Sequence, residues 1–298
     1  MRKLEIKSPA KVNLYLKIIK KREDGYHEII TLFERIDLAD DIIVEKSHKK
    51  IEISSYGRKI PLTKNNLAYR AALLLSQKLG KNLGVRIRIF KQIPVGAGLG
   101  GGSSNAASVL LGLNRLYELG IENKIFFKWG RILGSDVNFF LSRERFALGY
   151  GRGEDIRPLN LNLRIWHLVV YPGFSVSTPL IYTSFASQKA FDEIGLTKKT
   201  QGVRILTDIL NKRNLGNIKD VLFNSLEAVV LEKYPSIFFW KKQLLSTSAK
   251  GVLVSGSGSS VFGIYSERKE ADGIRKDLQR LKKRGEFFVV STDYLSFG

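Results

Sequence analysis

Five glycines stand within seven residues in the first half of the chain: Gly96, Gly98, Gly100, Gly101 and Gly102. Glycine loses more backbone entropy on folding than any other residue, so a plain flexible turn, the simplest alternative, rarely contains such a run. An apparent strand over 85–93 precedes the glycines, and a helix to about residue 117 follows them. Main chain without Cβ atoms can press its N–H groups against a ligand, and the helix dipole favours negative charge there. The sequence therefore predicts a phosphate-binding loop.

Two better-known phosphate loops do not fit this segment. Gly96, Gly98 and Gly101 spell G-x-G-x-x-G, but the dinucleotide fold requires an acidic residue about 20 positions on, after a second strand. Glu118 lies instead on the same predicted helix. A P-loop requires lysine where Gly102 stands, directly before Ser103. A third kind of phosphate loop is indicated, with Ser103 and Ser104 as candidate caps of the helix.

Composition sets the outer bounds of the fold. A chain of 298 residues with 44% hydrophobic and 26% charged residues is long enough for two globular domains. The glycine-rich stretch that ends at Gly153 predicts the boundary, which gives domains over 1–153 and 154–298. There is no cysteine, and the three histidines are too scattered for a metal cluster. No signal peptide or membrane span is apparent, so we expect a cytoplasmic protein with no membrane partner.

The charge is unusual, because 49 basic and 28 acidic residues give +21. A nucleic-acid-binding protein concentrates its basic residues in a stripe, whereas an enzyme for polyphosphates can carry a diffuse positive field. The densest basic runs, 46–50 and 280–284, fall in a predicted loop and at a predicted helix end. The charge alone does not decide between these two classes.

Periodicity predicts an α+β chain. Strands are expected over 12–18, 29–33, 85–93, 167–171, 252–255, 261–265 and 287–290, and helices over 67–75, 123–133, 203–210, 218–231 and 271–281. Asp24-Gly25 predicts a turn between the first two strands. Alternation places Lys11 and Asn13 on one face of the first strand.

The loop and its flanks resemble a known family. The string from Pro94 to Ala107, PVGAGLGGGSSNAA, is similar to the central phosphate-binding motif of the GHMP kinases, named after galactokinase, homoserine kinase, mevalonate kinase and phosphomevalonate kinase. SPAKVNL at 8–14, DGYH at 24–27 and GSDV at 134–137 resemble one branch of that superfamily, and SGSG at 255–258 resembles its third motif. The resemblance is thin over 185–221.

This resemblance implies a two-domain α+β fold with the active site in the cleft between the domains. It implies transfer of the ATP γ-phosphoryl group to the C2 hydroxyl of a methylerythritol unit attached to cytidine diphosphate, for the isoprenoid pathway that does not use mevalonate. Lys11 and Asp136 match the family's catalytic pair. By local sequence alone, Asp136 after Ser135 would cap a helix and Lys11 would be a solvated strand lysine.

The resemblance also implies the binding residues. The expected ATP contacts are Asn66, Pro94, Gly96, Gly98, Leu99, Gly100, Gly101, Gly102, Ser103 and Ser104. The expected contacts to the cytidyl substrate are Asn13, Tyr26, His27 and Tyr182, with stacking on the aromatic rings and hydrogen bonds to the cytosine edge. The local alternatives are a turn-flanking hydrophobe for Tyr26 and a surface histidine for His27. Mg²⁺ is expected with ATP, and no carboxylate cluster marks a dedicated metal site.

Some positions depart from the family pattern, and other functions stay open. Asn138 stands where proline is common, and Ser225 replaces an acid in Asn224-Ser225-Leu226-Glu227, so we assign no function to that element. The alternatives are another GHMP kinase, for a mevalonate-type alcohol, and a basic nucleic-acid-binding protein. The sequence does not determine the oligomeric state.

Overall fold

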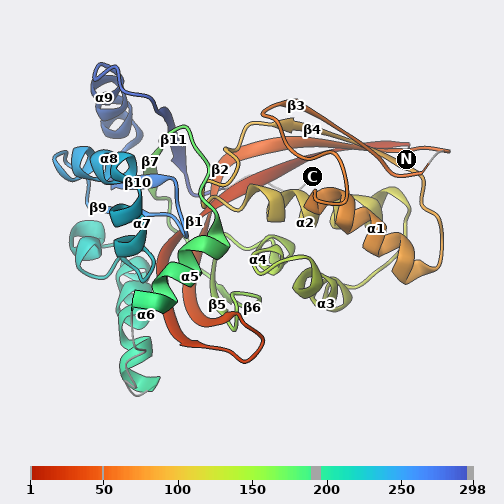
Figure 1. Cartoon of the computed structure of the whole chain (residues 1–298), viewed down its shortest axis with the longest axis horizontal. Helices are drawn as coiled ribbons and strands as arrows, with labels where there is room; N and C mark the ends of the chain where they lie inside the picture. The colour runs from red at the N-terminus through yellow and green to blue at the C-terminus, as the bar shows by residue number, and fades with distance from the viewer. Residues whose placement is uncertain (1, 49, 189–195, 294–298) are drawn as a thin grey trace.

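Two β-sheets form the framework of the computed structural model, which describes residues 2–48, 50–188 and 196–293 (Figure 1). The larger sheet has the order β3-β4-β2-β1-β8, with β5 paired to β2 and β6 paired to β5. Its strands are β1 (Lys3–Lys21), β2 (His27–Lys46), β3 (Glu52–Gly57), β4 (Val85–Lys91), β5 (Phe146–Tyr150), β6 (Asp155–Leu159) and β8 (Phe223–Asn224). The smaller sheet has the order β11-β7-β10-β9. Its strands are β7 (Trp166–Tyr171), β9 (Gly251–Val254), β10 (Val261–Tyr265) and β11 (Glu286–Ser291).

Helices pack against both sheets. In the first half they are α1 (Leu67–Leu79), α2 (Gly101–Leu116), α3 (Asn123–Leu133) and α4 (Val137–Ser142). The second half has α5 (Thr178–Gln188), α6 (Leu196–Asn211), the 3₁₀ helix η1 (Leu215–Asp220), α7 (Glu227–Lys233), α8 (Pro235–Leu245) and α9 (Arg268–Gln279). Helix α2 packs directly on β1 and β2, and α1 and α4 pack against α2. Helices α8 and α9 pack on the smaller sheet, on the left in Figure 1.

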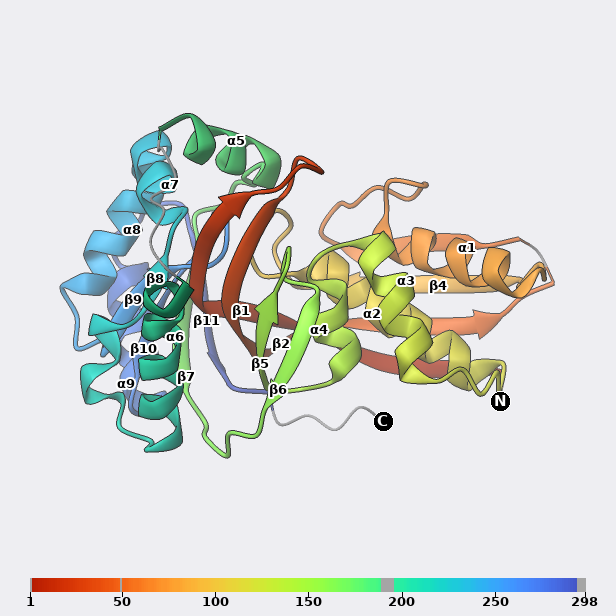
Figure 2. The same ribbon diagram turned by 90° about the horizontal axis from the view of Figure 1, so that it is seen from below.

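The antiparallel pair of β1 and β2 runs through the whole molecule. The strands are 19 and 20 residues long, and their register shifts at three places, including Pro9/Ala10 and Asn13/Tyr15. Bulges of this kind bend a strand, and the pair curves from the helices of the first half toward the second half (Figure 2). The strands predicted over 12–18 and 29–33 are the central parts of these longer strands.

The chain returns from β11 to β2 and closes a buried polar seam between the two sheets. Thr292 bridges to Ile36 and its hydroxyl donates to Glu34 at 2.6 Å. Arg35 and Asp293 form an ion pair at 2.7 Å with side chains only 4% and 1% exposed. Charges so deeply buried are stable only when paired, so this seam fixes the second sheet against the first.

The helix predicted over 218–231 is wrong. The chain there forms η1, then the two-residue strand β8, then α7. Asn224 stops the helix because its side-chain amide donates to the carbonyls of Val254 and Gly256, at 2.9 and 2.7 Å, and its oxygen accepts from Leu226 N at 2.9 Å. Strand β8 also pairs with β1. These long-range bonds outweigh the apolar periodicity on which the prediction relied.

Most other predicted elements are confirmed. Helix α3 has the predicted bounds, and α1 ends at Gly80, which takes the left-handed conformation with φ 61°. Strand β6 lies beyond Gly153 yet pairs with β5 in the first sheet, and the second sheet begins at β7. The division into domains at residue 153 stays a prediction. No helix within the described ranges is long and apolar enough to cross a membrane.

The seam predicts a large stability effect for Asp293→Asn. Because the substitution leaves the guanidinium of Arg35 buried without its counter-charge, we expect the free energy of unfolding to fall by about 3 kcal/mol or more. Urea unfolding followed by circular dichroism measures it. Asp277→Asn is the control, since Asp277 pairs with Arg280 in solvent, and this variant should unfold like the wild type. Equal stability of the two variants would contradict the role of the seam.

Candidate active site

One cavity of about 660 Å³ gathers residues from both halves of the chain. Its wall combines β1, the hairpin between β1 and β2, the start of α1, the glycine loop, the 135–136 turn, the start of α5 and the 256–257 turn. The predicted site residues that line it are Lys11, Asn13, Tyr26, His27, Asn66, Pro94, Gly96, Gly98, Leu99, Gly100, Gly101, Gly102, Ser103, Asp136 and Tyr182. Ser104 is the one predicted residue outside this lining, since it is fully buried with its hydroxyl 2.8 Å from that of Ser8.

The glycine loop depends on positive φ and close backbone approach. Gly96, Gly98 and Gly100 have φ of 61°, 76° and 69°. A Cβ on Gly98 would lie 1.9 Å from the carbonyl oxygen of Ser255. Helix α2 begins at Gly101 with Gly100 as its N-cap and no side-chain capping bond, so the expectation that Ser103 or Ser104 caps the helix is wrong. A left-handed glycine turns the chain into the helix here, which places both serines inside the first turn.

The carbonyl groups of the loop are bound by other parts of the protein. Val176 N donates to Gly96 O at 2.9 Å, Ser260 N to Ala97 O at 3.1 Å, and Lys11 N to Leu99 O at 3.0 Å. The first N–H groups of a helix have no partner within it, and those of α2 belong to Gly101, Gly102 and Ser103, which border the cavity. The loop therefore presents donors and a positive helix end to the cavity, which is the chemistry of an anion site.

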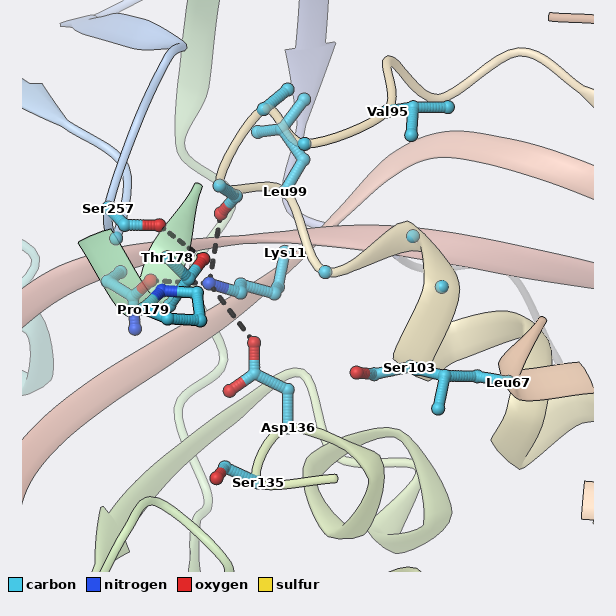
Figure 3. A pocket seen from close by; sticks show the side chains of 18 of the residues that line it. Lys11, Leu67, Val95, Leu99, Ser103, Ser135, Asp136, Thr178, Pro179 and Ser257 are labelled. Atoms are coloured by element: carbon cyan, nitrogen blue, oxygen red, sulfur yellow. Dashed lines mark hydrogen bonds and ion pairs between the residues drawn. The ribbon is translucent and has the colours of Figure 1, made fainter. Parts of the chain in front are cut away.

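Lys11 links three parts of the site (Figure 3). Its ammonium donates to Asn13 Oδ1 at 2.6 Å and to Gly98 O at 2.9 Å, and it lies 3.4 Å from Asp136 Oδ2. The Lys11 side chain is 5% exposed and that of Asp136 30%. Asp136 occupies the N-cap position of α4 but makes no capping bond. Its carboxylate points at Lys11 instead, so the local expectation of a helix cap does not describe this side chain.

A second buried lysine contacts the start of α2, where the glycine loop ends. Lys91 at the end of β4 pairs with Asp40, whose other oxygen accepts from Gln92 N and Ile93 N at 2.8 and 2.9 Å. Burial lowers the pKa of Lys91, and the charge of Asp40 opposes that shift. A Cβ on Gly101 would lie 2.8 Å from Lys91 Nζ, so this pair sits directly against the start of α2.

The far end of the cavity is aromatic. The rings of His27 and Tyr182 lie 5.2 Å apart at 34°, and Tyr26, 52% exposed, projects from the hairpin. Burial raises the pKa of Tyr182, and the negative charge of Asp136 adds to the shift. The hydroxyl of Tyr182 therefore stays protonated at neutral pH. The rings of Tyr26, His27 and Tyr182 can stack on a planar heterocycle, and their hydroxyl and imidazole groups can form hydrogen bonds with it.

Asn66 has a structural role at the opposite end. Its side-chain oxygen accepts from Ala68 N at 2.8 Å and caps α1, and its amide donates to Pro61 O at 2.8 Å. A contact of Asn66 with the adenine ring stays a prediction.

The sequence analysis missed several lining residues. The guanidinium of Arg152 lies 4.6 Å from the ring centroid of Tyr26, although its glycine-rich segment had suggested only a domain boundary. Thr178 and Ser257 also line the cavity, and their hydroxyl oxygens lie 2.7 Å apart. Ser255 lies outside the lining but supports the glycine loop, because its Oγ donates to Gly98 O at 2.9 Å. The glycine-serine pattern of 255–258 was the signal for the last two residues. No group of three His, Cys, Asp or Glu suited to a metal occurs among the residues that the structure describes.

Comparisons with known proteins agree with this fold and site. The model of the GHMP kinase N-terminal domain matches residues 66–143, and that of the C-terminal domain matches 206–283. A relative from Alkaliphilus oremlandii, named 4-diphosphocytidyl-2-C-methyl-D-erythritol kinase, is 39% identical over 294 residues, which cover 98% of this chain and 97% of the relative. A relative of the same name from Syntrophus aciditrophicus is 38% identical and covers 97% and 100%.

Solved structures give the same result. The crystal structure of a 4-(cytidine 5'-diphospho)-2C-methyl-D-erythritol kinase superposes with a TM-score of 0.79 at 35% identity, covering 97% of this chain and 100% of that one. The crystal structure of L. major mevalonate kinase shares the fold with a TM-score of 0.76 at 15% identity, covering 96% of this chain and 95% of that one. The chain belongs to the GHMP kinases and, within them, to the family of 4-diphosphocytidyl-2-C-methyl-D-erythritol kinases.

The loop geometry predicts different effects on the melting temperature for substitutions at two glycines of this stretch, Gly98 and Gly102. Gly98→Ala places a methyl group against the Ser255 carbonyl and forces a residue with Cβ into positive φ, so we expect a lower melting temperature. Gly102→Ala meets only Leu67 Cδ1 at 3.6 Å and gains helix propensity, so its melting temperature should equal or exceed that of the wild type. Calorimetry of the ligand-free variants measures both. Equal destabilisation of the two would contradict the close approach of Gly98 and Ser255.

The burial of His27 predicts a pH effect. Burial lowers the pKa of His27 from its ordinary 6.5, and the charge of Lys21 lowers it further. The unfolded chain therefore binds this proton at higher pH than the native chain. The free energy of unfolding is therefore unaffected by His27 above about pH 6.5, and it falls as the pH drops from that value toward the lower pKa of the native state. We expect an NMR titration midpoint for His27 below 6.5, assigned by comparison with His27→Gln; a midpoint above 6.5 would refute the shift.

Proposed function

We propose that the chain transfers the γ-phosphoryl group of ATP to the C2 hydroxyl of 4-diphosphocytidyl-2-C-methyl-D-erythritol. The single observation that carries the proposal is the arrangement of one cavity, in which the Lys11–Asp136 pair lies between the glycine loop and the Tyr26, His27 and Tyr182 rings. The names of the relatives support the choice of alcohol. GHMP kinases use ATP as the phosphoryl donor, and the loop suits its phosphates.

In the proposed reaction the alcohol oxygen forms a bond to the γ-phosphorus while the bond from that phosphorus to the β,γ-bridging oxygen breaks, and ADP leaves. Asp136 orients the hydroxyl and accepts its proton, since its carboxylate is partly exposed to the cavity and is kept in place by Lys11. The ammonium of Lys11 holds the Asp136 carboxylate in place and stabilises the negative charge on the transferring oxygens. Such catalysis consists mainly of positioning and charge stabilisation.

The N–H groups at the start of α2 hold the phosphates in this proposal, and Ser103 adds its hydroxyl. The side chain of Ser103 points into the space that also contains Asp136 (Figure 3). The Ser103 hydroxyl and one Asp136 carboxylate oxygen would suit a Mg²⁺ ion that takes its other ligands from phosphate and water, as this ion prefers. When bound, Mg²⁺ would neutralise charge on the ATP phosphates.

The aromatic end of the cavity holds cytosine in the proposed complex. Tyr26 and Tyr182 supply stacking, which any base can use, and His27 supplies a hydrogen bond to the ring edge. The lowered pKa of His27 keeps its imidazole neutral at pH 7, so one ring nitrogen can donate and the other accept. Asn13, bonded to Lys11 and to Thr31 at 2.8 Å, contacts the erythritol hydroxyls.

Incubation with ATP, Mg²⁺ and the cytidyl alcohol tests the function, with phosphorus NMR as the measurement. A new phosphomonoester resonance together with ADP is the expected result. Mevalonate in place of the cytidyl alcohol serves as the comparison. Phosphorylation of mevalonate without phosphorylation of the cytidyl alcohol would replace the proposal with another GHMP kinase activity.

The role of Asp136 predicts a selective loss of turnover in Asp136→Asn. The amide keeps the size of the side chain but cannot accept the hydroxyl proton, so we expect kcat to fall about 10²- to 10⁴-fold. Circular dichroism shows whether the variant folds, and some fall in the melting temperature is expected because the buried ammonium of Lys11 loses a counter-charge 3.4 Å away. A variant that folds and retains near-normal kcat would remove Asp136 from the mechanism.

A further inference from the structure

Arg58 connects the two sheets beside the chain that leads into the glycine loop. It follows Gly57 at the end of β3, and its guanidinium forms a fork with the carboxylate of Glu286, the first residue of β11. Nη1 donates to Oε1 at 2.9 Å and Nη2 donates to Oε2. The partners are 228 positions apart in the sequence, so this fork is a contact that the tertiary fold creates.

Arg58 is also bound to the chain that leads into the glycine loop. Its Nε donates to the carbonyl of Gln92 at 2.8 Å, and its backbone N–H donates to the carbonyl of Lys91 at 3.3 Å. Gln92 stands two positions before Pro94, where the loop begins to line the cavity. The guanidinium further lies 5.7 Å from the ring centroid of Tyr171, which pairs with Glu286 in the second sheet.

The segment that Arg58 begins forms one wall of the cavity. Ile60 and Pro61 line the cavity, and Asn66 fixes the far end of the segment through its bond to the Pro61 carbonyl. Arg58 fixes the near end. The wall is therefore held at both ends, and one of its two anchors depends on an acidic residue from the second sheet.

We propose that the Arg58–Glu286 fork is a positioning pair for ATP. Neither side chain lines the cavity, so the pair acts through the 60–66 wall and through Gln92 at the base of the glycine loop. The Tyr26, His27 and Tyr182 rings come from the hairpin and from α5, which the pair does not contact. ATP affinity should depend on the fork, and affinity for the alcohol should not. The inference rests on the proposed function for the placement of ATP at the glycine loop and for the identity of the second substrate.

Exposed ion pairs generally contribute little to stability, so the role of the Arg58–Glu286 pair depends on its geometry. Glu52 and Arg86 offer a comparison, because the 3.1 Å contact between Arg86 Nε and the Glu52 carboxylate joins adjacent strands of one sheet. The carboxylates of Glu52 and Glu286 are similarly exposed, at 36% and 44%. Only the Glu286 pair is bidentate, joins two sheets and shares its guanidinium with a carbonyl beside the loop. Bidentate pairs fix geometry as well as charge.

The test compares Glu286→Gln and Arg58→Lys with Glu52→Gln. Calorimetry without alcohol measures the dissociation constant of ATP, and steady-state assays measure KM for each substrate. We expect Glu286→Gln and Arg58→Lys to raise the dissociation constant of ATP about three- to fivefold, with a change below about twofold in KM for the cytidyl alcohol. Glu52→Gln should match the wild type in every measurement.

Two results would overturn the inference. One is an ATP dissociation constant in both variants equal to that of the wild type. The other is any sign that the fork serves general stability, which is either an equal rise in KM for both substrates or failure of both variants to fold. Since calorimetry needs no alcohol, a wild-type chain that binds ATP but leaves the cytidyl alcohol unphosphorylated would refute the proposed function and still allow this test.

Discussion

The contacts of one buried ammonium group, that of Lys11, hold the candidate active site together. A cation removed from water is stable only where oxygens surround it. Lys11 finds these oxygens on β1 at Asn13, on the glycine loop at Gly98 and before α4 at Asp136. The ammonium of Lys11 therefore holds these three segments next to one another. The contacts that stabilise this buried charge also place the Asp136 carboxylate beside the glycine loop.

The glycine loop belongs to both halves of the chain. Its carbonyls accept bonds from Val176, Ser255 and Ser260 of the second half as well as from Lys11. Ser175 Oγ adds a bond to the carbonyl of Val95 at 2.7 Å. The Asp40–Lys91 pair fixes the chain before the loop from inside the first half. The loop keeps its shape because both sheets hold it, and the buried seam of Arg35 and Asp293 holds the sheets to each other.

The predictions from sequence succeeded where local forces decide. Helix α1 forms over the predicted residues, with Asn66 as its N-cap and Gly80 as its C-cap, and α3 has the predicted bounds. They were wrong where distant partners decide. The serines after the glycines look like caps, but the close approach of Gly98 to Ser255 sets the path of the chain, and Gly100 starts the helix. The apolar pattern over 218–231 gave way to the bonds of Asn224 with the 254–256 segment.

The sequence by itself determined a glycine-rich stretch that leads into a helix, which predicts a phosphate loop, and its motifs indicated the family and the Lys11 and Asp136 pair. Glycine spacing, turn residues and short motifs act locally, so they can be recognised without coordinates. Only the tertiary structure decided that Asp136 turns from its helix toward Lys11, that Arg152 lies over Tyr26, and that Arg58 reaches Glu286. Those contacts join residues far apart in the chain, and their geometry exists only once the long β1–β2 pair has bent and both sheets have packed around the loop.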